Sequence, residues 1–119
     1  MTVLGLMRDL MFRSRLDSAA DALGVEVGYA GNLAVVTARC AELKPDLVVV
    51  DLSEAGFPPR ETLAAVKGGA PDARVIGFAS HVDLKTIGAA REAGFERVLS
   101  RQEFVSRLPA LLKSGESRA

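Results

Sequence analysis

The chain has 119 residues, of which 49% are hydrophobic, and its 15 basic and 15 acidic residues leave no net charge. This length predicts a single domain over residues 1–113, with a polar, frayed tail over 114–119. Balanced charge gives no electrostatic basis for binding nucleic acid. No apolar run is long enough to cross a membrane, and the N-terminus lacks a signal-peptide pattern. We therefore expect a soluble, cytoplasmic protein.

Strand and helix patterns alternate along the whole chain. The apolar runs predict five strands, at Thr2–Met7, Val25–Tyr29, Pro45–Asp51, Ala73–Ala79 and Glu96–Leu99. The segments between and after them have apolar residues at helical spacing, which predicts helices at Leu10–Leu23, Leu33–Leu43, Arg60–Lys67 and Leu84–Ala93, and a last helix after Ser100. Strict alternation indicates an α/β fold of (βα)5 type, a doubly wound parallel sheet with helices on both faces.

Several residues mark the expected ends of these helices. Asn32 and Asp83 stand where N-caps are expected, and Ser100 with Glu103 has the spacing of a capping box. Gly24 and Gly94 follow helical patterns as left-handed ends, and Gly68-Gly69 should end the third helix. Pro109 lies inside the last helical pattern, so that helix either kinks there or consists of two short pieces.

Asp51 is the first candidate for a functional residue. It ends an apolar run typical of a strand buried on both faces, and a polar loop follows it. Ligands of open parallel sheets gather at the carboxyl ends of the strands. The alternative is a structural role, in which Asp51 accepts hydrogen bonds from its own loop.

Three segments of the sequence resemble the receiver domains of bacterial response regulators. Pro45–Leu52 is similar to the segment that ends at the family's phosphoacceptor aspartate, which places that position at Asp51. Pro71–His81 and Ala89–Phe95 are similar to the segments around the family's fourth and fifth strands. The resemblance covers nearly the whole chain and implies a flavodoxin-like, receiver-like sheet with strand order 2-1-3-4-5.

The residues that handle metal and phosphate in this family are altered here. Receivers carry an acidic pair after the first strand that binds Mg²⁺, whereas this chain has Met7 and Arg8, with Asp9 one place further on. An arginine beside a metal ion would repel it. No metal site is therefore expected, and Asp9 and Asp51 are the remaining candidate ligands. We hypothesise instead that Arg8 and Arg101 form a permanent ion pair with Asp51; the alternative is a solvent-exposed Arg8.

The residues that read the phosphorylated state in the family are also altered. The hydroxyl position after the fourth strand falls on Ala79, with Ser80 beside it, and the aromatic switch position falls on Val98. The lysine position falls on Arg101, which keeps the charge but has a planar head, and the family's following proline is Gln102. The chain thus resembles an atypical receiver, or pseudo-receiver.

Two functions are compatible with this pattern. The first is a non-enzymatic signalling module that needs no cofactor and binds a partner protein, or a second copy, through the face of the fourth helix, fifth strand and fifth helix. The second is a working receiver that requires Mg²⁺ and accepts phosphate on Asp51 from a histidine kinase or a small phosphodonor. A nucleotide-binding domain or a metabolic enzyme is disfavoured, because no glycine-rich phosphate loop and no nucleophile–base pair is present.

Overall fold

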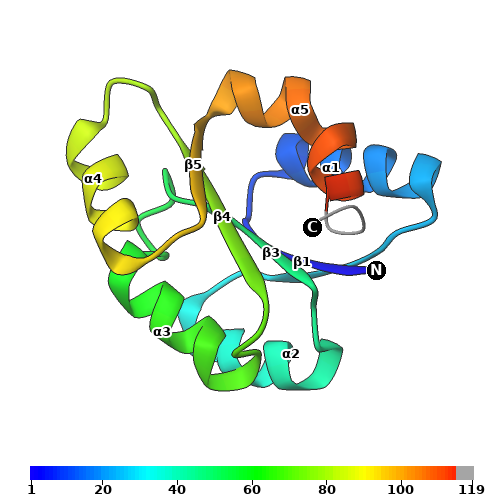
Figure 1. The fold of residues 1–119 in the computed structure, drawn as a ribbon, viewed down its shortest axis with the longest axis horizontal. Helices are drawn as coiled ribbons and strands as arrows, with labels where there is room; N and C mark the ends of the chain where they lie inside the picture. Colours follow the sequence, from blue (N-terminus) through cyan, green and yellow to red (C-terminus); the bar gives the residue numbers. More distant parts are fainter. Residues whose placement is uncertain (115–119) are drawn as a thin grey trace.

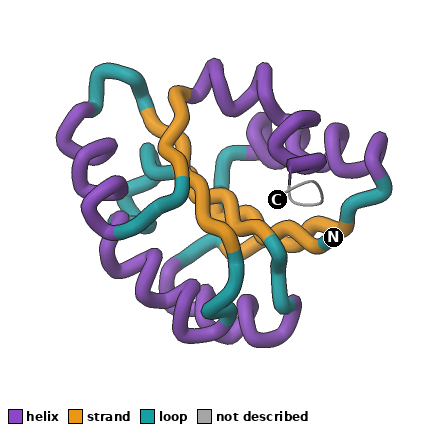
Figure 2. The backbone as a smooth tube through the Cα atoms, viewed as in Figure 1, coloured by secondary structure: helices purple, strands orange, loops and turns teal. Residues whose placement is uncertain are grey.

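The computed structural model describes residues 1–114, which form a five-stranded parallel sheet between two layers of helices (Figures 1 and 2). The strands lie in the order β2-β1-β3-β4-β5, which confirms the predicted topology. Their bounds are β1 Thr2–Leu6, β2 Glu26–Ala30, β3 Leu47–Asp51, β4 Arg74–Ala79 and β5 Arg97–Ser100. Of the tail expected over 114–119, Ser114 is the last residue of α5, and residues 115–119 lie outside the described residues.

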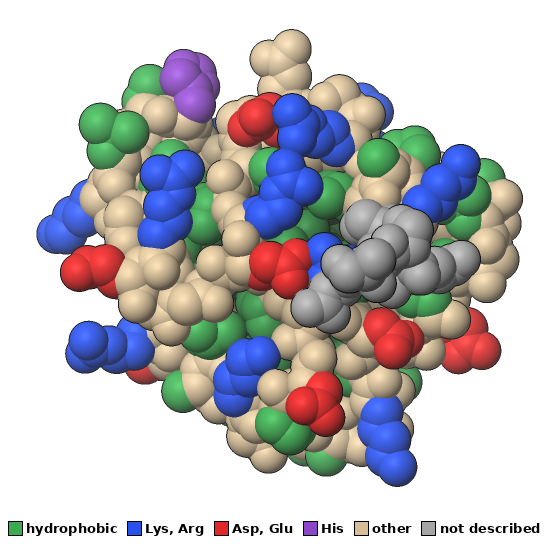
Figure 3. Space-filling model, viewed as in Figure 1, with side chains coloured by type: hydrophobic (Ala, Val, Ile, Leu, Met, Phe, Trp, Pro, Cys, Tyr) green, Lys and Arg blue, Asp and Glu red, His purple; other side chains and the backbone are tan. Residues whose placement is uncertain are grey.

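Helices α1 and α5 cover one face of the sheet, and α2, α3 and α4 cover the other (Figure 1). Their bounds are α1 Leu10–Leu23, α2 Val36–Leu43, α3 Pro59–Gly69, α4 Leu84–Ala93 and α5 Arg101–Ser114. None of these described helices is both long and apolar enough to cross a membrane. On the face seen in Figure 3, basic and acidic side chains are interspersed, as the balanced composition suggests.

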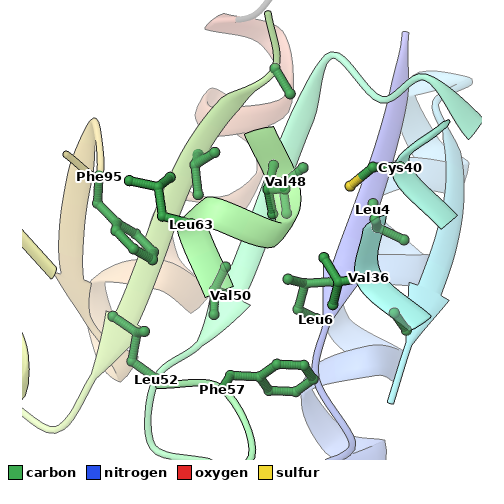
Figure 4. Packing of buried hydrophobic residues seen from close by; sticks show 14 of the residues in the cluster. Leu4, Leu6, Val36, Cys40, Val48, Val50, Leu52, Phe57, Leu63 and Phe95 are labelled. Carbon is green, nitrogen blue, oxygen red and sulfur yellow. The ribbon is translucent and has the colours of Figure 1, made fainter. Parts of the chain in front are cut away.

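Each face of the sheet has its own hydrophobic core. Successive side chains of a strand point to opposite faces, so Val48 and Val50 of β3 pack under α2–α4 while Leu47 and Val49 pack under α1 and α5. Figure 4 shows the first core, in which Cys40 is fully buried among aliphatic side chains. The two cores explain why β3 is apolar at every position before Asp51.

The predicted helix signals are confirmed at α1, α4 and α5. The side chain of Asp83 accepts a hydrogen bond from the Thr86 N–H at 3.2 Å, and Gly24 and Gly94 adopt left-handed conformations after their helices. Ser100 and Glu103 form the capping box, in which each side chain accepts the backbone N–H of the other residue.

Two expectations about helix ends are wrong, and one is confirmed. A 3₁₀ turn, Leu33–Val35, precedes α2, and the Asn32 side chain makes no capping hydrogen bond. The last helix is not two short pieces but one continuous segment through Pro109, which lies on its exposed side. Gly68 and Gly69 are the last two residues of α3, which ends there as predicted, and Gly69 is also where the backbones of α2 and α3 approach closely.

Candidate functional site

The carboxyl ends of four strands bring the predicted site positions to one edge of the sheet. Strands β3, β4 and β5 end at Asp51, Ala79 and Ser100, and residue pairing between them keeps these ends level. Arg8 follows β1 at the same edge, and Arg101 is the first residue of α5. The topology therefore brings together the segments that the sequence singled out.

Asp51 is held by its own loop. Its carboxylate is 2% exposed, and Oδ1 accepts hydrogen bonds from the Ser53 backbone N–H at 3.0 Å and from the Ser53 hydroxyl. The Asp51 carbonyl accepts the Glu54 N–H at 3.2 Å, which tightens the turn. The structural alternative, in which Asp51 caps its loop, is confirmed.

The loop after β3 is anchored on both sides of this turn. Leu52 and Phe57 are buried in the core under α2–α4, and Figure 4 shows the Phe57 ring turned toward Leu6. The Leu52 N–H donates to the Phe78 carbonyl at 2.9 Å. A side chain at Gly77 would collide with Leu52, since a Cβ there would lie 2.6 Å from Leu52 Cδ1. These contacts hold the Asp51 turn in one position.

The hypothesised ion pair of Asp51 with Arg8 and Arg101 is wrong. Among the described residues, the ion pairs are Arg39–Glu42 and Arg74–Glu96. Arg8 is exposed, and its Cγ lies near Gly31, which follows β2. Because β1 lies between β2 and β3, this direction takes the Arg8 side chain away from Asp51. The expected alternative, an exposed Arg8, is the one observed.

The residues after β1, where a receiver binds its metal ion, have structural roles in this protein. Met7 is fully buried in the core under α1 and α5. Asp9 is the N-cap of α1, and its Oδ1 accepts the N–H groups of Met11 at 2.8 Å and Phe12 at 3.2 Å. No group of three or more acidic, histidine or cysteine side chains suited to a metal occurs in residues 1–114.

These side chains do not fit a Mg²⁺ ion. Magnesium demands octahedral oxygen coordination and usually binds through one or two carboxylates. Here one carboxylate caps a helix, the other is bonded to Ser53, and an arginine follows β1. This leaves two carboxylates where the receiver pattern has three, and the Oδ1 atom of each already accepts local hydrogen bonds.

The switch positions lack the groups that read a phosphoryl oxygen. Ala79 is fully buried and has no hydrogen-bonding side chain. The neighbouring Ser80 hydroxyl faces its own loop and accepts the Val82 N–H at 3.5 Å. Val98 is half-buried against the core, and Arg101 is exposed. His81 is exposed in the loop before α4.

A neighbouring cluster of polar residues was not predicted. Arg13 of α1 donates from Nε to the Met7 carbonyl at 2.9 Å, and its guanidinium lies 4.5 Å from the centre of the Tyr29 ring. The Tyr29 hydroxyl donates to Asp17 Oδ1 at 2.7 Å. Burial, and then the hydrogen bond to Asp17, raise the pKa of Tyr29 above its usual range. The four-residue spacing of Arg13 and Asp17 is the only sequence signal of this cluster.

Comparison with known proteins identifies the fold. No family model matches the sequence, and neither does any curated protein. Solved structures match at low sequence identity. A response regulator from Hahella chejuensis has a TM-score of 0.84 and 16% identity, with 98% of this chain and 96% of that chain covered. A response regulator from Thermotoga maritima has a TM-score of 0.76 and 23% identity, with 98% and 97% covered.

A third similar structure contains a metal. The receiver domain of a sensor histidine kinase from Pseudomonas aeruginosa, with a magnesium ion coordinated in its active-site cleft, has a TM-score of 0.78 and 10% identity, with 94% of this chain and 93% of that chain covered. The protein therefore has the fold of response-regulator receiver domains.

Proposed function

We propose that this chain is a receiver-like signalling domain of a two-component-type pathway in the cytoplasm, and that it acts as a protein–protein interaction module without Mg²⁺-dependent phosphorylation. The proposal rests on the hydrogen bonds that the two candidate metal ligands, Asp9 and Asp51, already make. Asp51 holds its own loop through Ser53, and Asp9 caps α1. Both carboxylates therefore have structural roles that need no metal.

The alternative is a working receiver that accepts a phosphoryl group on Asp51. In its favour, Asp51 ends the central strand β3 of a fold that holds magnesium in a similar protein. Against it, phosphoryl transfer depends on cations that neutralise the developing charge, and Met7 and Arg8 stand where the receiver pattern has the acidic pair that holds such a cation. The attached group would also find no hydroxyl at Ala79.

The partner would bind through the face formed by α4, β5 and α5. Within α4 only Ala90 is buried, whereas Leu84 at its start is 74% exposed and Val82 just before it is 72% exposed. Figure 3 shows hydrophobic side chains beside His81, which lies in the same loop. Exposed apolar side chains that lie together on a surface are typical of protein interaction sites. The alternative partner is a second copy of the chain, which would form a homodimer through this face.

The test of the proposed function is the intact mass of the protein after incubation with acetyl phosphate and Mg²⁺. The proposal predicts no phosphoryl adduct on the native chain, matching the Asp51→Asn control. An adduct on the native protein that is missing from Asp51→Asn would establish a working receiver and overturn the proposal.

A further inference from the structure

Two arginine side chains converge beside Gly31, on the β2 side of β1. A Cβ atom at Gly31 would lie 3.8 Å from Arg13 Nη2 and 3.9 Å from Arg8 Cγ, so both side chains approach the same point. Gly31 follows β2, and Arg8 follows β1, so this point lies at the carboxyl edge of the sheet. Asp51 ends β3 on the opposite side of β1, which separates this point from the phosphoacceptor position.

Arg13 is held in place before any ligand arrives. Its Nε donates to the Met7 carbonyl at 2.9 Å, and its guanidinium stacks over the Tyr29 ring. Tyr29 is itself fixed, because its hydroxyl lies 2.7 Å from Asp17 Oδ1 and 3.0 Å from the Arg13 carbonyl oxygen. A planar guanidinium that is already ordered loses little side-chain entropy when its remaining N–H groups bind an anion.

No carboxylate of residues 1–114 pairs with either arginine. The nearby acids have other partners, since Asp9 caps α1 and Asp17 accepts the Tyr29 hydroxyl. By contrast, Arg39 of α2 forms an ion pair with Glu42 at 2.5 Å. An anion bound beside these two side chains would supply the missing counter-charge.

We propose that Arg8, Arg13 and the open position at Gly31 form a binding site for a phosphate group. Guanidinium groups match the geometry of phosphate oxygens and bind them through paired hydrogen bonds. Two of them balance the charge of a phosphate dianion. The absent side chain at Gly31 leaves the space between them open. This site does not depend on the proposed function, because Asp51 takes no part in it.

The test is a titration of the full chain with inorganic phosphate, followed by the backbone amide NMR signals of Gly31 and its neighbours. We expect saturable shifts, and a dissociation constant at least fivefold weaker in Arg8→Gln, because Arg8 is exposed and makes no ion pair within residues 1–114. Gly31→Leu should weaken binding similarly by filling the space while keeping both arginines. Arg91→Gln, which removes an exposed arginine from α4, should leave the affinity unchanged.

A parallel titration with adenosine monophosphate distinguishes a site for free phosphate from a site for an organic phosphomonoester. Equal affinity for the two probes indicates a free-phosphate site, and tighter binding of the nucleotide indicates an organic phosphomonoester. The absence of saturable shifts with both probes would overturn the proposal. So would an affinity that is unchanged in Arg8→Gln and Gly31→Leu, or one that falls equally in Arg91→Gln.

Discussion

Substitution by alanine should have opposite effects on the free energy of unfolding at Gly68 and Gly69, two adjacent glycines at the end of α3. A Cβ at Gly69 would lie 2.2 Å from the Thr37 carbonyl oxygen and 2.8 Å from Cys40 Cβ, both on α2. These are main-chain or near-main-chain atoms, so Gly69→Ala forces the two helices apart. Overpacking of this kind typically lowers the free energy of unfolding by about 3 kcal/mol.

Gly68→Ala is the matched control, one residue away in the same helix. A Cβ at Gly68 would make an ordinary contact of 3.4 Å with Thr37 Cγ2. Replacing a helical glycine by alanine then raises the free energy of unfolding by about 0.5–1 kcal/mol. At about 4 °C per kcal/mol for a domain of this size, Gly69→Ala should lower Tm by about 12 °C, and Gly68→Ala should raise it by about 2–4 °C.

Circular dichroism measures both transitions, with urea unfolding at 25 °C as a second readout. The predicted order of stability is Gly68→Ala above the native protein and Gly69→Ala well below it. If the two variants had the same Tm, or if Gly69→Ala were as stable as the native chain, the close approach of α2 and α3 would be refuted.

Two further predictions concern stability. The Thr62 hydroxyl is buried without a hydrogen-bond partner, so Thr62→Val should raise the free energy of unfolding by about 1 kcal/mol; the Thr37 hydroxyl donates to the Ala65 carbonyl at 2.8 Å, so Thr37→Val should lower it by about 1 kcal/mol in the same urea titration. Hydrogen bonds from Thr86 lower the pKa of Asp83, and hydrogen bonds from Ser100 lower that of Glu103. At low pH the unfolded chain therefore binds more protons than the folded protein. Stability should fall as the pH drops below the ordinary pKa values of 3.8 for Asp83 and 4.5 for Glu103. In Asp83→Asn and Glu103→Gln, Tm should depend less on pH over that range.

The parts of the fold that follow from local patterns could be predicted from the sequence. Helices α1 and α4 have the predicted bounds because their caps, Asp83 and Gly94 among them, are side chains and glycines acting within one turn. The strand order could be predicted only through the resemblance to receiver domains, since alternation alone fixes neither edge of the sheet.

The features that failed depend on distant contacts. Gly69 ends α3 as its pattern predicts, but its second role, the close approach to α2, becomes visible only when the two helices lie together. The direction of Arg8 likewise depends on β2, because the space beside Gly31 accepts its side chain on the side away from Asp51. Spacing along the chain carries no information about such neighbours.

The sequence predicted which residues lie at the candidate site but not which side chains contact one another there. Asp51 lies where the sequence placed it, yet its partner is Ser53, two residues away, and not an arginine from another strand. An aspartate that bonds the backbone two residues on is a common turn signal. Such a local bond forms without bringing distant charges together, whereas the ion pair required side chains from three separate segments to meet.

Magnesium titration of the native protein, followed by isothermal calorimetry and the amide signals of Arg8, Asp51 and Ser53, tests the central claim most directly. We predict no saturable binding, because Met7 and Arg8 replace the acidic pair and the Oδ1 atoms of Asp9 and Asp51 already accept local hydrogen bonds. Saturable Mg²⁺ binding that shifts these signals and is lost in Asp51→Asn would contradict it, and would show that the edge of the sheet still assembles a metal site.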